Sequence, residues 1–306
     1  MLLPVGDNIE RRTFPVFSCV LVFANLLVFA YQVRLVIHHP GDIRPTMDFI
    51  HSWGLVPDDL ADGRYVGALT HMFLHGGIAH IFGNMFCLWA FACSLEVGVG
   101  AWYLAGFYLV WGVAGGLLHA FMSWGSDVPL IGASGAIAGL MGAYAILYGA
   151  DTKITSLLFI GWKPFTFRVP AMLYCGGWFV MQILSARYDA HMEGGVAWYA
   201  HIGGFATGAL TALIVKSELQ WDLIADRDGT LKFRERGVNP NANKIYLDGI
   251  HYDVAENDVA GNGSGLPDDC PYCHEPLDES RRITPGVARC ANETCARLIY
   301  AGVQYA

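Results

Sequence analysis

Six long runs of apolar residues, separated by polar connections, occupy the first 216 residues of the chain. They cover approximately residues 14–37, 79–95, 101–122, 133–149, 168–186 and 197–216, and each contains few or no charges. A helix of about 20 apolar residues crosses a hydrocarbon core of roughly 30 Å. The pattern therefore predicts an all-α membrane protein in which a short segment at 1–13 precedes a bundle of six transmembrane helices at 14–216.

The overall composition agrees with this class. Of the 306 residues, 54% are hydrophobic and only 15% are charged, whereas an average soluble protein carries about 25% charged residues. The mean hydropathy is +0.37. These values exclude an ordinary soluble domain, a disordered chain and a coiled coil as descriptions of the whole protein. The net charge of −8 offers no basic surface for nucleic acid, so we expect the lipid bilayer, and no nucleic acid, as a partner.

The distribution of Lys and Arg predicts the orientation. Arg11 and Arg12 precede the first apolar run, and Lys153, Lys163 and Arg168 lie between the fourth and the fifth. Cationic connections tend to remain on the cytoplasmic side, so six spans leave both termini in the cytoplasm. No small-residue cleavage site follows the first run, which we interpret as an uncleaved span. Short polar ends without an organelle signal favour a bacterial inner membrane.

Polar residues within three of the runs are candidates for chemistry, because such residues in a membrane are rare and often functional. His80 and Asn84 are spaced i, i+4 on one face of the second run. Ser134 lies at the start of the fourth run, and His201 lies in the sixth run. In the predicted topology these three helices run in the same direction. His80, Ser134 and His201 each precede the far end of their helix by about 15 residues, which places all three roughly 22 Å from that end.

Small residues predict that two of these helices approach closely. Gly135 and Gly139, like Gly204 and Gly208, form small-xxx-small faces. Packing of the two faces would bring Ser134 near His201.

Such an arrangement suits nucleophilic catalysis. A serine hydroxyl needs a base to remove its proton, and histidine is the usual one, while His80, Asn84 and the Ser134 amide could stabilise an oxyanion. Taken singly, each residue has a simpler interpretation. Serine commonly bonds its own helix, and histidine or asparagine can join neighbouring helices.

The chain resembles the rhomboid family of intramembrane serine proteases. The matching segments are residues 71–84 (HMFLHGGIAHIFGN), 132–136 (GASGA) and 200–208 (AHIGGFATG), and the likeness covers roughly residues 8–216. The resemblance implies a Ser134–His201 dyad without a carboxylate, and an oxyanion hole formed by His80, Asn84 and the Ser134 amide. It implies transmembrane proteins as substrates and no cofactor for catalysis.

One position departs from the family pattern. Some members carry a tyrosine four residues after the serine that stacks on the catalytic histidine, and here that position is Ala138. Another group must therefore orient His201. Two further functions stay open: a proteolytically inactive rhomboid-like protein that binds membrane clients, and a transporter or channel with a proton path through His80 and His201.

The C-terminal part differs in composition. Residues 217–269 form a polar linker region, and residues 270–306 contain two cysteine pairs, Cys270 with Cys273 and Cys290 with Cys295. Four thiolates at such spacing suit a structural zinc ion, which the cytoplasm would favour by keeping thiols reduced. We therefore predict a zinc-ribbon-like module that resembles partner-binding ribbons. His274 could replace one ligand, and two disulfides or free thiols are the alternative.

Overall fold

The computed structural model describes residues 3–11, 13–149, 151–160, 162–188, 197–219, 221–225 and 229–235, together with five short strands farther along the chain. Two compact units divide the chain, Met1–Glu235 and Arg236–Ala306. The candidate site lies entirely in the first unit.

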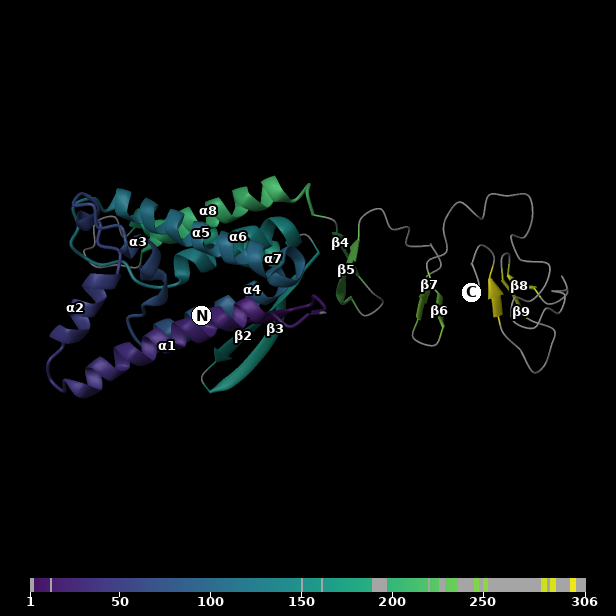
Figure 1. The fold of residues 1–306 in the computed structure, drawn as a ribbon, viewed down its shortest axis with the longest axis horizontal. Coiled ribbons are helices and arrows are strands. Elements are labelled where there is room, and N and C mark those ends of the chain that lie inside the picture. Colours follow the sequence, from purple (N-terminus) through teal and green to yellow (C-terminus); the bar gives the residue numbers. More distant parts are fainter. Residues whose placement is uncertain are drawn as a thin grey trace. The chain divides into compact units, whose positions relative to one another are not determined.

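A helix occupies each of the six apolar runs (Figure 1). These helices are α1 (Val16–His38), α4 (Ile78–Val99), α5 (Ala101–Met122), α6 (Ser134–Tyr148), α7 (Ala171–Tyr188) and α8 (Trp198–Val215). Among the described residues, four of them are long and apolar enough to cross a membrane: α1, α4, α5 and α8. At 15 residues, α6 is shorter, and Gln182 and Arg187 interrupt the apolar character of α7. The count of six spans therefore stays a prediction.

Short helices fill the connection between α1 and α4. They are α2 (Arg44–Trp53), the 3-10 turn η1 (Asp58–Leu60), α3 (Gly67–Thr70) and the 3-10 turn η2 (His71–Phe73). The connection is fixed to the loop before α6, because Leu55 exchanges backbone hydrogen bonds with Leu130 and the Gly132 amide donates to the His71 carbonyl. These bonds hold the start of α6 from outside the helix.

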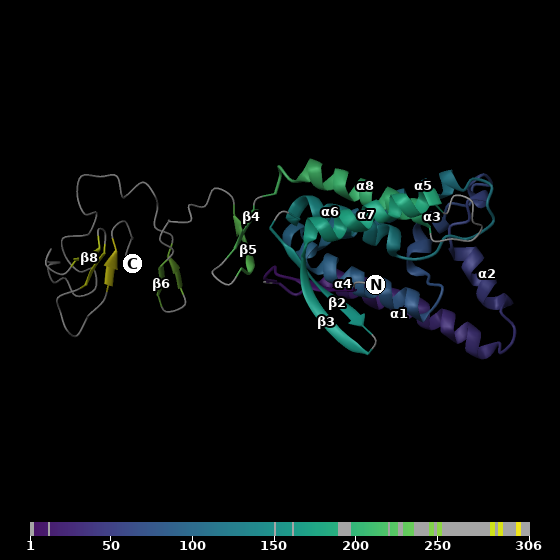
Figure 2. The ribbon, with the colours of Figure 1, turned by 180° about the vertical axis from the view of Figure 1, so that it is seen from behind.

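Helix α6 is the buried centre of the first unit. Most of its residues are inaccessible, and α5, α6 and α8 lie side by side in two opposed views (Figures 1 and 2). The predicted close approach of α6 and α8 is confirmed: a Cβ atom at Gly204 would overlap the Gly135 carbonyl, and one at Gly208 would overlap the Gly139 carbonyl. Glycine at these positions therefore lets the two backbones touch.

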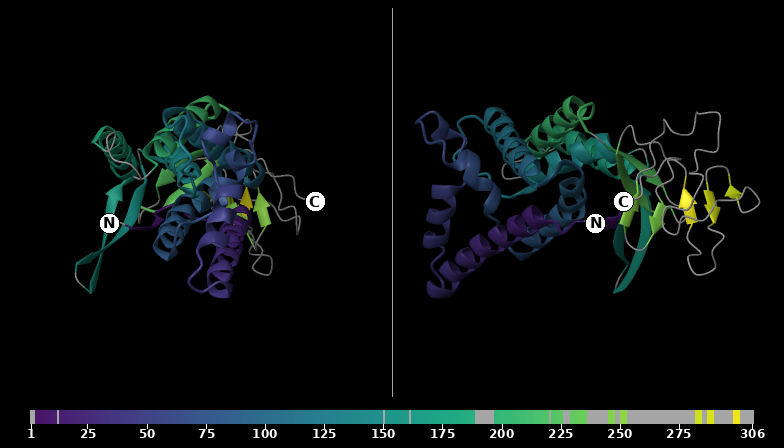
Figure 3. Two further views of the ribbon diagram at one scale, coloured as in Figure 1. Left: turned by 90° about the vertical axis from the view of Figure 1, so that its left-hand side faces the viewer. Right: turned by 45° about the vertical axis from the view of Figure 1, so that its right-hand side comes forward.

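A three-stranded antiparallel sheet, which the apolar pattern did not predict, lies at the end of α6 remote from Ser134. Its strands are β1 (Leu3–Asp7), β2 (Lys153–Ile160) and β3 (Lys163–Pro170), in the order β1-β2-β3. The β2–β3 hairpin extends away from the helices (Figure 3), and almost all of β3 is exposed. The fifth helix accordingly begins at Ala171, three residues after the predicted start of the fifth run.

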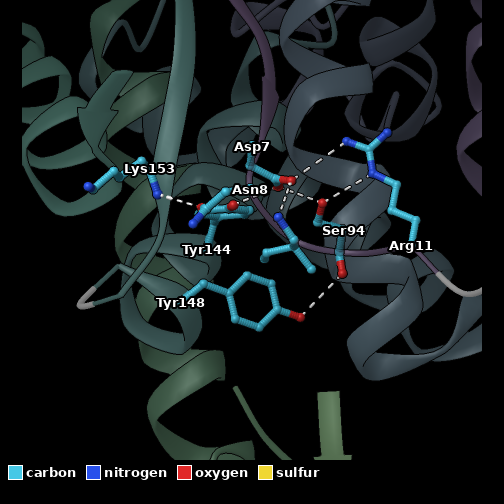
Figure 4. A network of polar contacts seen from close by, with 8 residues as sticks. Asp7, Asn8, Arg11, Ser94, Tyr144, Tyr148 and Lys153 are labelled. Carbon is cyan, nitrogen blue, oxygen red and sulfur yellow. Dashed lines mark hydrogen bonds and ion pairs between the residues drawn. The ribbon is translucent and has the colours of Figure 1, made fainter. Parts of the chain in front are cut away.

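Polar contacts attach β1 to the helices (Figure 4). The Asp7 carboxylate accepts hydrogen bonds from Ser94 Oγ at 2.6 Å and from Tyr144 Oη at 2.7 Å. Its side chain is only 1% exposed, with Arg11 at 4.0 Å. A buried carboxylate is costly unless it is paired and hydrogen-bonded, so these donors are what allow Asp7 to lie between α4 and α6.

Glu96 performs a similar role for α1. Its two carboxylate oxygens accept hydrogen bonds from the amides of Phe17 and Ser18, and one of them also accepts from Ser18 Oγ. The first amides of a helix have no partner within the helix, and a negative charge there is favourable. Glu96 therefore caps α1.

The segment that the composition marks as a linker begins with ordered structure. Strands β4 (Trp221–Ala225) and β5 (Leu231–Glu235) form a hairpin that belongs to the first unit, where Leu231 exchanges backbone hydrogen bonds with Asn8 and Glu10. In the second unit, β6 (Ile245–Leu247) pairs with β7 (Ile250–Tyr252). Strands β8 (Arg282–Thr284), β9 (Val287–Arg289) and β10 (Leu298–Tyr300) form an antiparallel sheet.

Candidate active site

Ser134 and His201 lie in direct contact. Ser134 is the first residue of α6, His201 lies in the first turn of α8, and the Ser134 Oγ atom is 2.8 Å from His201 Nε2. The proximity predicted from the glycine faces and from equal helix depth is thus observed. A hydroxyl that donates to an imidazole nitrogen has the geometry of a nucleophile paired with its base.

Two side chains of α7 contact the other side of the His201 ring. Gln182 Oε1 lies 2.7 Å from His201 Nδ1, and the Trp178 ring is tilted by 43° with its centroid 5.5 Å from that of His201. Trp198, at the start of α8, meets the imidazole edge-on at 6.2 Å. Since Ala138 offers no ring, these contacts orient His201 in place of the stacked tyrosine.

His80 and Asn84 direct hydrogen-bond donors at the chain just before Ser134. The Gly76 amide donates to His80 Nδ1 at 3.2 Å, which leaves the proton of a neutral ring on Nε2. A Cβ atom built on Gly132 would lie 2.8 Å from His80 Nε2 and 3.6 Å from Asn84 Nδ2. Both donors therefore converge on Gly132, two residues from the serine.

The Asn84 amide nitrogen has no hydrogen-bond partner among the described residues. It is buried, and the part of the chain that the structure describes offers it no acceptor. A buried donor without a partner is costly and calls for an explanation. An acceptor supplied by a substrate, such as a carbonyl oxygen that becomes negative during the reaction, would satisfy it.

A cavity of about 1310 Å³ is lined by the four candidate residues, His80, Asn84, Ser134 and His201. Its walls include polar groups together with apolar side chains of α4 and α7, among them Cys87, Leu173 and Met181. A cavity of this size, mostly apolar with a few convergent polar groups, is the usual form of a binding site.

Two buried histidines in the connection before α4 support the site. His71 donates from Nδ1 to the Gly67 carbonyl at 2.9 Å, and burial lowers its pKa to about 4. The His75 ring packs between Phe29 and His80, and burial, with a smaller effect of His80, lowers its pKa to about 4 as well. Both rings are therefore neutral at pH 7.

Sequence reasoning missed two residues of this site. Gln182 is a polar amide within the fifth apolar run, a signal that could have marked it as a candidate. The second is Gly132, which the sequence offers only as part of the GASGA motif. Its φ of +123° and its closeness to His80 leave no room for a side chain at this position. No group of three metal-ligating side chains occurs among the described residues, while Cys270, Cys273, Cys290 and Cys295 lie outside them.

Comparisons with known proteins identify the family. The family described as Rhomboid domain matches residues 62–218, just over half of the chain. "RHOMBOID-like protein 4" of Arabidopsis thaliana is 28% identical over 67% of this chain and 49% of its own length. "Rhomboid protease GluP" of Bacillus subtilis is 27% identical over 64% of this chain and 38% of its own length. "Rhomboid protein 1, mitochondrial" of Saccharomyces cerevisiae is 29% identical over 53% of this chain and 45% of its own length.

The chain spans about half the length of the curated relatives it matches. The family match covers every helix from α4 to α8 and contains Ser134, His201, His80 and Asn84. Together with the apolar helices, it shows that this chain is an integral membrane protein of the rhomboid family.

Proposed function

We propose that this chain is an intramembrane serine endopeptidase that cleaves transmembrane segments of other membrane proteins. The contact of 2.8 Å between Ser134 Oγ and His201 Nε2 carries the proposal. Membership of a family that includes a relative named as a protease supports it. The apolar walls of the cavity support a transmembrane segment as the substrate.

The reaction assigns one task to each group. His201 Nε2 accepts the Ser134 proton while Oγ attacks the carbonyl carbon of the scissile bond. The negative charge that forms on the carbonyl oxygen is stabilised by the Nε2–H of His80, the Nδ2–H of Asn84 and the Ser134 amide. His201 then donates its proton to the leaving amine, and water hydrolyses the acyl-enzyme by the same route in reverse.

Labelling by a fluorophosphonate probe in detergent tests the proposal. We expect the wild type to be labelled, and Ser134→Ala and His201→Ala to remain unlabelled while both stay folded. The wild type should also cleave a model transmembrane substrate. A folded wild type that retains this substrate without labelling or product would instead favour the inactive, client-binding function. Ion flux in sealed vesicles that survives Ser134→Ala would favour a transporter.

The topology and the C-terminal module complete the proposal. Six spans are supported by the six apolar runs, and a cytoplasmic location of both termini is supported by the Lys and Arg distribution. Accessibility of single introduced cysteines in intact bacterial cells, where we propose the chain resides in the inner membrane, tests this arrangement. A structural zinc ion bound by Cys270, Cys273, Cys290 and Cys295 is supported by their spacing. The metal content of the purified chain should be one zinc ion, and Cys273→Ser should lose it.

A further inference from the structure

Gln182 offers His201 a specific hydrogen-bond partner from a neighbouring helix. Its Oε1 atom lies 2.7 Å from His201 Nδ1, and both side chains are buried, with exposed fractions of 5% and 7%. A short polar contact away from water defines the proton positions of both partners, because an unmatched donor or acceptor is costly there.

The second hydrogen bond of Gln182 fixes which end of its amide faces the histidine. The Nε2 amide nitrogen donates to the Trp178 carbonyl, one turn earlier in α7, at 3.4 Å. If the amide were reversed, its oxygen would face that carbonyl oxygen, and two acceptors would meet. The oxygen of the amide therefore points at His201.

The orientation of the amide determines the tautomer of the imidazole. An amide oxygen can only accept, so His201 Nδ1 must carry the proton. A neutral ring then leaves Nε2 without a proton, free to accept the hydrogen bond from Ser134 at 2.8 Å. The opposite tautomer would set two acceptors against each other at Nδ1, and its Nε2–H would donate to Ser134 Oγ, so that Nε2 could not take the serine proton.

We infer that Gln182 is a positioning residue that holds His201 in the tautomer able to accept the Ser134 proton, and that it takes the place of the carboxylate of a triad. A neutral amide differs from a carboxylate here, because it fixes the proton on Nδ1 without adding charge to the membrane interior. This inference rests on the proposed function.

Two isosteric variants separate the hydrogen bond from mere packing. Gln182→Met keeps the length of the side chain but lacks a strong acceptor, whereas Gln182→Glu keeps an acceptor oxygen. Asn25→Leu is the matched control, because Asn25 is a fully buried amide in α1 that bonds the Leu21 carbonyl of its own helix. The measured quantities are kcat and KM for a transmembrane substrate, together with the rate of fluorophosphonate labelling.

We expect Gln182→Met to lower kcat and the labelling rate about tenfold or more with KM nearly unchanged. Gln182→Glu should restore most of the loss, and Asn25→Leu should retain the wild-type values. Equal rates for Gln182→Met and the wild type would overturn the inference. So would equal losses in the Met and Glu variants, or an equal loss in Asn25→Leu.

Nitrogen-15 NMR of histidine-labelled protein provides a readout that does not need activity. The 11 histidines are resolved by comparison with His201→Phe, and the two ring nitrogens of His201 report which one carries the proton. We expect protonated Nδ1 in the wild type and a mixture of tautomers in Gln182→Met. Protonated Nδ1 in a wild type that neither labels nor cleaves would refute the proposed function and leave the positioning role intact. An unchanged tautomer in Gln182→Met would overturn the inference itself.

Discussion

Gly132 and His80 approach so closely that a Cβ atom at residue 132 would lie 2.8 Å from the His80 Nε2 atom. The φ of +123° at Gly132 is also one that other residues rarely adopt. Two independent constraints therefore meet at this glycine, two residues before the serine.

We predict that Gly132→Ala abolishes labelling of Ser134, because the added methyl group displaces His80 or the chain before α6. Gly125→Ala is the matched control, since Gly125 has a φ of +79° and open space around it. It should lose only a small part of its stability, about 1–2 kcal/mol, and keep labelling. Normal labelling of Gly132→Ala would contradict the placement of His80 as an oxyanion donor.

Asn84 should contribute to activity without contributing to stability. Its amide nitrogen is buried without an acceptor in the described part of the chain, so removal should leave the thermal unfolding temperature unchanged or raise it. Removal of an oxyanion donor lowers kcat by about 10²- to 10³-fold in enzymes, and we expect this loss for Asn84→Ala with little change in KM. Cleavage kinetics and thermal unfolding of the same preparation check both parts, and a stability loss that accounts for the activity loss would argue for a structural role.

The α6–α8 contact can be tested at Gly208. A Cβ atom there would overlap the Gly139 carbonyl, and overpacking costs about 1–3 kcal/mol. We expect Gly208→Ala to lower the unfolding temperature and to reduce labelling, since separation of the helices moves His201 away from Ser134. Gly106→Ala in α5, where nothing lies within 4 Å of the added atom, should be neutral, and a similar loss there would point to a general effect of glycine replacement.

Sequence alone could predict the contact between Ser134 and His201 because its signals are local and strong. Ser134, His201, His80 and Asn84 are polar residues in apolar surroundings, and a rise of about 1.5 Å per residue converts their positions into depth. The glycines at i and i+4 spacing in each run predicted the α6–α8 contact. Each of these features can be recognised within a single apolar run.

The partner of His201 could not be predicted with the same certainty. Gln182 precedes His201 by 19 residues on a different helix, and one amide in an apolar run has no partner that the sequence identifies. For the same reason β1 could not be predicted, because it pairs with β2 about 150 residues later in the chain. Contacts between distant segments depend on tertiary packing, which a hydrophobic pattern reports only as burial.

Acid should destabilise the connection before α4 through His71 and His75. Burial lowers the pKa of each to about 4, whereas the unfolded chain has a histidine pKa near 6.5. Between these values the unfolded state binds more protons, so the free energy of unfolding falls as pH falls from about 6.5 to about 4. Thermal unfolding in detergent across this range should show the loss, and it should level off near neutral pH.

His75→Phe should weaken this dependence. The His75 ring packs between two other rings, and its nitrogens have no hydrogen-bond partner within the described residues, so phenylalanine keeps an aromatic ring there without breaking a hydrogen bond and without a group to protonate. His71→Phe is the contrasting variant, because it also removes the bond from Nδ1 to the Gly67 carbonyl. We expect it to lower the unfolding temperature even at pH 7.5, where His75→Phe remains as stable as the wild type. A pH dependence that His75→Phe leaves unchanged would mean that His75 is not buried as a neutral ring, and the acid sensitivity would then belong to His71 or to groups elsewhere in the chain.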